Sequence, residues 1–240
     1  MGDNILNVIK NNIIMIVFYL FLGLFSLVLN FFDHFNLLNK THIIVMNVFI
    51  WIFIIYLLSG IYYHFYAQMY LKNINKFINN CNRYFCKLFK TNLILGITKI
   101  LFLIPFILSI IFYNASNIFP SNVVRIISFS VYSLLTVFAI AFIYTKGISG
   151  INAVLLSVKY IAKHTRKIGP IFLIITFKLI INIVLLYISI KIDSYTYIYW
   201  IYSGIRYLCN NFFDLLLFIF SLKIINDVDH LVKSNSNNCP

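Results

Sequence analysis

The residues most able to do chemistry in this sequence are five polar side chains that interrupt its last two apolar runs. They are Lys178 and Asn182 in the run 169–190, and Arg206, Asn210 and Asp214 in the run 197–225. A charge at the centre of a lipid bilayer costs about 2.5–3.5 kcal/mol, so such residues tend to be paired or to face a water-filled cavity. Two roles are therefore open: an ion pair that holds helices together, or a polar track for an ion, a proton or a solute.

The positions of these residues predict pairing between the two runs. Lys178 lies about 13 Å from the start of its helix and Asp214 about 13 Å before Lys223, because each helical residue advances about 1.5 Å. A short loop joins the runs, which makes them antiparallel neighbours. Asn182 and Asn210 match in depth one turn further along. We expect Lys178 to pair with Asp214, and Asn182 with Asn210.

Three interpretations of these residues remain open. The pairs could be a structural clamp, since polar contacts commonly hold membrane helices together. They could instead line a polar track. In the third interpretation the helix boundaries differ, and Lys178 extends its side chain toward the membrane surface.

The composition indicates that lipid surrounds most of the chain. The 240 residues are 62% hydrophobic and 10% charged, whereas soluble domains average about 25% charged residues. A span needs about 20 mostly apolar residues. We predict an all-α membrane helix bundle, with residues 1–225 forming one domain and 226–240 a polar cytoplasmic tail. The six predicted spans are about 12–32, 43–66, 92–113, 122–144, 169–190 and 197–225.

Charge is distributed unequally among the segments that connect these runs. The chain has 19 Lys and Arg against six acidic residues, a net charge of +13. The stretches Ala67–Thr91 and Lys146–Ile168 hold ten of the basic residues and no acid. Because cytoplasmic loops are enriched in Lys and Arg, both stretches, and with six spans both termini, are predicted to be cytoplasmic. The expected partner of these cations is the anionic headgroup of a lipid, with no nucleic acid.

Both basic stretches have the period of an amphipathic helix, at about 70–90 and 148–167. The first apolar stripe contains Leu71, Ile74, Phe77, Ile78, Cys81, Tyr84, Phe85 and Leu88, and the second contains Ile151, Val154, Leu155, Val158, Ile161 and Ala162. Nine cations form a candidate surface for lipid headgroups or a protein partner: Lys72, Lys76, Arg83, Lys87, Lys90, Lys159, Lys163, Arg166 and Lys167. Membrane orientation alone explains this charge in one interpretation. A docking surface for a cytoplasmic or membrane protein is the other.

The two basic stretches are also similar to each other. Ile74-Asn75 opens the first and Ile151-Asn152 opens the second. In each, a tyrosine precedes a lysine by three residues, at Tyr84–Lys87 and Tyr160–Lys163. The order span, basic helix, span therefore occurs twice, and we interpret it as a parallel internal repeat.

This layout, over residues 43–190, resembles bacterial six-span membrane families of unknown function. It also resembles the membrane domain of some glycerophosphodiester phosphodiesterases. The catalytic domain of those enzymes is not part of this sequence, so the resemblance implies no phosphodiesterase activity. The length and topology are similar to those of ABC-exporter permease subunits as well, which implies transport driven by a separate ATPase.

Motifs for catalysis and for cofactors are lacking in the sequence. No Walker loop, GxGxxG, GxSxG or HExxH occurs, so we expect no enzyme activity and no cofactor. We also expect no metal; a site at His34, His42 and Asp33 on the outer side is the weaker alternative. The cysteines Cys81, Cys86, Cys209 and Cys239 lack a CxxC spacing, and we predict free thiols.

Taken together, these patterns predict a non-catalytic integral membrane protein. The abundant Ile, Asn, Phe, Tyr and Lys have AT-rich codons, from which we infer a bacterial origin. The preferred hypothesis is an accessory or transport-associated component of the bacterial cytoplasmic membrane. The alternative is a transporter or ABC-type permease subunit with a polar track in the last hairpin.

Overall fold

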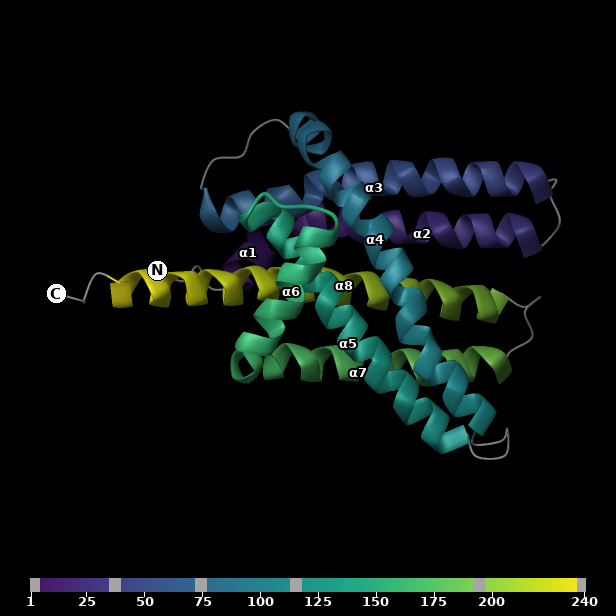
Figure 1. The fold of residues 1–240 in the computed structure, drawn as a ribbon. Helices are drawn as coiled ribbons and strands as arrows, with labels where there is room; N and C mark the ends of the chain where they lie inside the picture. The colour runs from purple at the N-terminus through teal and green to yellow at the C-terminus, as the bar shows by residue number, and fades with distance from the viewer. Residues whose placement is uncertain (1–4, 35–39, 72–76, 113–117, 192–196, 237–240) are drawn as a thin grey trace. The chain divides into compact units, whose positions relative to one another are not determined.

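Eight α-helices make up the part of the chain that the computed structural model describes, which is residues 5–34, 40–71, 77–112, 118–191 and 197–236 (Figure 1). No strand occurs within these ranges, in agreement with the predicted all-α class. The helices are α1 (Ile5–Asn11), α2 (Ile13–His34), α3 (Lys40–Tyr70), α4 (Phe77–Phe112), α5 (Ile118–Thr145), α6 (Ile151–Lys163), α7 (Thr165–Lys191) and α8 (Tyr197–Ser236).

Among the described residues, four helical segments are long and apolar enough to cross a membrane. They are Ile44–Tyr70, Ile127–Thr145, Thr165–Leu185 and Ile198–Asp229, in α3, α5, α7 and α8. A shorter apolar segment, Ile13–Leu22, lies in α2. This helix content is compatible with an integral membrane protein.

The first basic stretch is not a separate helix. α3 continues to Tyr70, and α4 begins at Phe77 and extends to Phe112 without interruption. The predicted boundary between a basic helix at 70–90 and a span at 92–113 therefore lies inside α4. No glycine or proline occurs between Lys87 and Leu95, so nothing in the sequence there disfavours continued helical hydrogen bonding.

The second basic stretch does contain a separate helix, α6. Gly147 and Gly150 before it have φ angles of 71° and 63°, which glycine adopts without steric cost because it lacks a Cβ. The hydroxyl Oγ1 of Thr91 accepts a hydrogen bond from the backbone N–H of Gly150 at 2.8 Å and fixes this loop. α6 ends at Lys163, so the segment predicted at 148–167 is divided between α6 and the first turn of α7.

The C-terminal helix is longer than the sixth span predicted at 197–225. α8 continues to Ser236, so most of the segment 226–240, predicted as a polar tail, is helical. Ile225 and Val228 remain buried at a spacing of three residues, and this apolar face continues the helix beyond the membrane-length run.

The chain divides into two compact units. The first comprises Met1–Phe89 and Lys178–Leu215, and the second comprises Lys90–Phe177 and Leu216–Pro240. Within the first unit, α2 and α3 lie side by side (Figure 1), and α2 buries one face that includes Ile16, Tyr19 and Leu22. Within the second, α5 packs against α6, and the buried core there contains Leu95, Leu135, Ala139, Ala153 and Val154.

Candidate functional site

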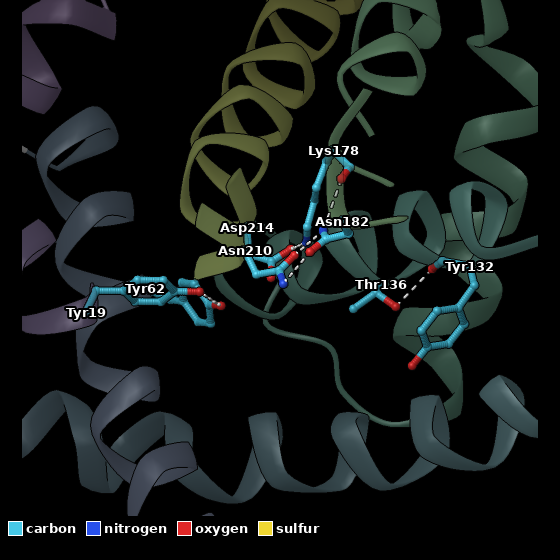
Figure 2. Close-up of polar contacts among 8 residues, drawn as sticks. All are labelled: Tyr19, Tyr62, Tyr132, Thr136, Lys178, Asn182, Asn210 and Asp214. Atoms are coloured by element: carbon cyan, nitrogen blue, oxygen red, sulfur yellow. Dashed lines mark hydrogen bonds and ion pairs between the residues drawn. The ribbon is translucent and has the colours of Figure 1, made fainter. Parts of the chain in front are cut away.

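The polar side chains of α7 and α8 meet as their positions in the sequence predict. Lys178 Nζ donates a hydrogen bond to Asp214 Oδ1 and forms an ion pair with that carboxylate (Figure 2). The Lys178 side chain is 10% exposed, whereas that of Asp214 is 43% exposed. Lys178 therefore directs its ammonium group toward Asp214 of the neighbouring helix.

A pair of amides lies beside the ion pair. Asn210 Nδ2 donates to Asn182 Oδ1 at 2.8 Å, and Asn182 Nδ2 donates in return to Asn210 Oδ1 (Figure 2). Asn182 Nδ2 also donates to the backbone carbonyl of Lys178 at 3.0 Å. We call these four residues, Lys178, Asn182, Asn210 and Asp214, the hairpin clamp. Its amide groups bond one another, so they need no water.

Helix geometry explains how the sequence builds the clamp. In each helix the two clamp residues are four positions apart and so lie on one face, one turn from each other. The antiparallel course of α7 and α8 then places Lys178 opposite Asp214 and Asn182 opposite Asn210. Arg206 lies one turn before Asn210 on α8 and is half-buried, but in the described residues it forms no ion pair with the clamp.

A tyrosine pair in the same unit has no counterpart in the sequence-based prediction. The hydroxyl oxygens of Tyr19 on α2 and Tyr62 on α3 are 3.2 Å apart, and both side chains are buried (Figure 2). Both tyrosines belong to the same compact unit as Asp214. In the sequence, each of these tyrosines is marked only by its position in an apolar run. Tyrosines that are simply buried in a core have the same position, so this signal does not predict the pair.

The first basic stretch places its aromatic and small residues against α3. The rings of Tyr63 and Tyr84 stack with centroids 4.9 Å apart, and Arg83 and Lys87 lie 5.6 and 5.7 Å from the Tyr84 ring centre. Arg83 and Lys90 are exposed and Lys87 is half-buried. Lys72 and Lys76, the other two cations predicted for this surface, lie outside the described residues.

Close approach of α4 to α3 depends on Gly60. A Cβ at Gly60 would clash with Cys81 Sγ and would lie 2.8 Å from the Phe77 ring, so a larger side chain does not fit. Ser59 Oγ donates to the Cys81 backbone carbonyl at 3.1 Å. Burial raises the pKa of the Cys81 thiol, which makes it a poor nucleophile at neutral pH. Cys81, Cys86 and Cys209 are all free thiols, as predicted, and Cys239 lies outside the described residues.

In the second unit, Tyr160 of α6 packs against α5. Its ring centre is 5.3 Å from those of Phe138 and Phe142, and its hydroxyl donates to the Ile224 carbonyl of α8 at 3.3 Å. Burial, followed by the nearby charge of Asp229, raises the pKa of Tyr160. Tyr84 and Tyr160, which correspond in the predicted repeat, thus both pack on aromatic rings of the preceding helix.

A second ion pair lies at the end of α5. Lys146 Nζ bonds Asp229 Oδ2, and the two side chains are 41% and 43% exposed. On α6 and the start of α7, the cations Lys159, Lys163, Arg166 and Lys167 are all exposed. Burial lowers the pKa of His164 between them, and the charges of Lys163 and Lys167 add to this effect, so the imidazole is largely neutral at pH 7.

The remaining sequence-based candidates are not brought together as a site. Within the described residues, no group of three or more His, Cys, Asp or Glu is placed to hold a metal ion. His42 is exposed, and the side chains of His34 and Asp33 lie outside the description. Comparison with protein-family models, with curated proteins and with solved structures finds no match to this chain.

Proposed function

We propose that the chain is a six-span protein of a bacterial cytoplasmic membrane, with both termini and both basic stretches in the cytoplasm. Four helical segments have membrane length, and α2 with 22 residues and α4 with 36 residues are each long enough for one further span, which supports six spans. The ten basic residues of the two acid-free stretches support this orientation. The similar packing of Tyr84 and Tyr160 supports a parallel repeat.

The orientation is testable by cysteine labelling in cells. Cysteines introduced at Asn79 and Asn117 should differ in their reaction with a membrane-impermeant maleimide. Asn79→Cys is expected to react only after the membrane is permeabilised, and Asn117→Cys to react in intact cells. Labelling of Asn79→Cys in intact cells would reverse the orientation.

Within that membrane, the protein acts as a non-catalytic accessory or transport-associated component. The observation that supports this role is the hairpin clamp, in which an ion pair and two amides satisfy one another. Such an arrangement stabilises a hairpin without requiring water. The expected role of the clamp is therefore to keep the α7–α8 hairpin closed while other surfaces bind partners.

A transporter is the second candidate, and Asp214 is the reason to retain it. Its side chain is 43% exposed although it lies at the middle of the apolar segment Ile198–Asp229. A carboxylate at that depth favours a wet surface over lipid. The nearby Tyr19 and Tyr62 hydroxyls would extend a polar track away from the clamp. As an ABC-type permease, the chain would bind a separate ATPase through residues 70–90.

Thiol accessibility distinguishes the two functions. In a variant whose four native cysteines are serine, Asn211→Cys introduces a thiol between Asn210 and Asp214 without altering the clamp. An accessory protein with a dry clamp predicts that this thiol reacts with a charged methanethiosulfonate as slowly as Leu217→Cys, whose site is 0% exposed. Reaction as fast as that of the exposed Lys90→Cys would support the polar track and contradict the accessory role.

A further inference from the structure

Helix α6 has two apolar faces, although its sequence predicts a single stripe. Ala153 and Ser157 are 0% exposed and Val154 is 6% exposed, and this buried face packs on Leu135 and Ala139 of α5. The other apolar positions, Ile151, Leu155 and Val158, remain 59%, 52% and 47% exposed. Packing within the second unit therefore uses only part of the apolar surface of α6.

The exposed apolar positions form a narrow ridge. At about 100° per residue, Ile151, Leu155, Val158 and Ala162 fall within about 60° of one another around the helix axis. Ala162 is exposed as well, so the ridge extends over the length of α6. The ridge is about three helical turns long, so an acyl chain can contact it along its side and not only at one point.

Cations lie next to the ridge, on one side of it only. Asn152, Lys159 and Lys163 are exposed and lie about 90° from the centre of the ridge, opposite the side that contains Val154. Arg166 and Lys167 add two exposed cations where α7 begins. In the described residues Lys159 and Lys163 form no ion pair, whereas Lys146 has Asp229 as its partner. The charge beside the ridge is therefore available to an external anion.

We propose that this ridge and the adjacent cations form a binding site for an anionic phospholipid. Acyl chains lie along Ile151, Leu155 and Val158, and the headgroup phosphate accepts hydrogen bonds from Lys159 and Lys163, which lie one helical turn apart. The row of cations lies about 90° from the apolar ridge around the helix axis. A phospholipid carries its charged group next to its hydrocarbon chains, so it can contact the ridge and the cations at the same time. A soluble nucleotide or an acidic peptide would leave the ridge in water. All residues of this site lie in the second unit. The proposal does not depend on which way the protein is oriented in the membrane.

The proposal is tested with the full chain in dodecyl maltoside, with phosphatidylglycerol and phosphatidylcholine of equal chain length as probes and native mass spectrometry as the measurement. Wild type should retain phosphatidylglycerol in preference to phosphatidylcholine. The variant Lys159→Gln/Lys163→Gln should lose about thirty-fold in apparent affinity for phosphatidylglycerol, since each lysine near an anionic headgroup contributes about 1 kcal/mol. The matched control, Lys10→Gln/Lys99→Gln, removes two exposed lysines that lie outside the predicted headgroup surface, and it should change the affinity less than about twofold.

Two further variants keep the test decisive. Lys159→Arg/Lys163→Arg preserves both charges and should keep the preference, which separates loss of binding from loss of folding. Leu155→Ser should weaken the binding of both lipids equally, because it alters the ridge and not the charge. Equal retention of the two lipids by wild type would overturn the proposal. An equal loss in the Lys10/Lys99 control would do so as well, because binding would then follow net charge.

Discussion

Two ion pairs on α8 share their chemistry but differ in their surroundings. Asp214 pairs with Lys178 of α7, and Asp229 pairs with Lys146 next to the end of α5. Asp214 lies at the middle of the apolar segment Ile198–Asp229, and Asp229 is its last residue. The Lys178 side chain is 10% exposed, whereas that of Lys146 is 41% exposed.

The contribution of an ion pair to stability therefore depends on its position. At the end of α8, water can solvate either charge when its partner is lost, so the pair stabilises the fold only slightly. In the middle of the apolar segment the buried Lys178 ammonium has little water to replace a lost partner, so its unpaired charge would remain in an apolar environment. The same two residue types therefore form a weak surface contact in one place and a strong constraint in the other.

The largest expected effect is that of Asp214→Asn. This change leaves the Lys178 ammonium without its counter-charge, and it should lower the free energy of unfolding by about 2.5–3.5 kcal/mol. Titration of the protein with SDS in mixed micelles measures that value. The matched control, Asp229→Asn, should cost less than about 1 kcal/mol, because its lysine remains hydrated.

A double variant sharpens the interpretation of this result. Lys178→Met with Asp214→Leu removes both charges and should recover most of the stability that Asp214→Asn loses. If the double variant is as harmful to folding and to cell function as the single one, a purely structural pair is excluded. The polar track would then be favoured.

A smaller effect is expected from the amide half of the clamp. Asn182→Leu leaves Asn210 without its partner and should cost up to about 1.7 kcal/mol, the upper range for polar contacts between membrane helices. The same SDS titration applies. Asn182→Leu with Asn210→Leu should cost less than the sum of the two single changes, and additive losses would show that the amides do not depend on each other.

Tyr160→Phe tests the surroundings of the outer pair. The change removes the hydrogen bond to the Ile224 carbonyl but keeps the ring against Phe138 and Phe142, so a loss of about 1 kcal/mol is expected in thermal unfolding. A loss as large as that of Asp214→Asn would contradict the difference between the two ion pairs. It would show that the end of α8 is as poorly hydrated as its middle.

The smallest effect is the coupling between Lys146 and Asp229. A double-mutant cycle with alanine at both positions should give about 0.2–1 kcal/mol at low salt. In 1 M salt, where the Debye length is about 3 Å, this coupling should disappear. The coupling between Lys178 and Asp214 should persist there, and an equal salt dependence of the two pairs would contradict their difference in exposure.

Much of the candidate site was predictable because its geometry is local to two neighbouring helices. The residues of the clamp are four apart in α7 and four apart in α8, and a short connection fixes the helices as antiparallel. Matching the depths of Lys178 and Asp214 therefore required only the helical rise. The pairing of Tyr19 with Tyr62 was not predictable in this way, because a tyrosine in an apolar run has no charge that demands a partner.

The helix boundaries were likewise predictable only where a local feature of the sequence sets them. The glycines at 147 and 150 interrupt the chain before α6 because they adopt positive φ angles. The stretch from Lys87 to Leu95 has no such residue, yet a change from basic to apolar composition there suggested a boundary that α4 does not have. Composition changes with the environment of a helix, whereas a helix ends where its backbone hydrogen bonding ends.

The all-α class, the membrane-length apolar runs, the segregation of basic residues and the clamp pairs follow from the amino-acid sequence, since each depends on hydrophobicity, charge or helical period. Which apolar side chains of α6 are buried depends instead on how the helices pack. This packing places Ala153, Val154 and Ser157 against the neighbours of α6 and leaves Ile151, Leu155 and Val158 exposed. Helical period defines a face, but the neighbours that pack against a helix decide which face is covered.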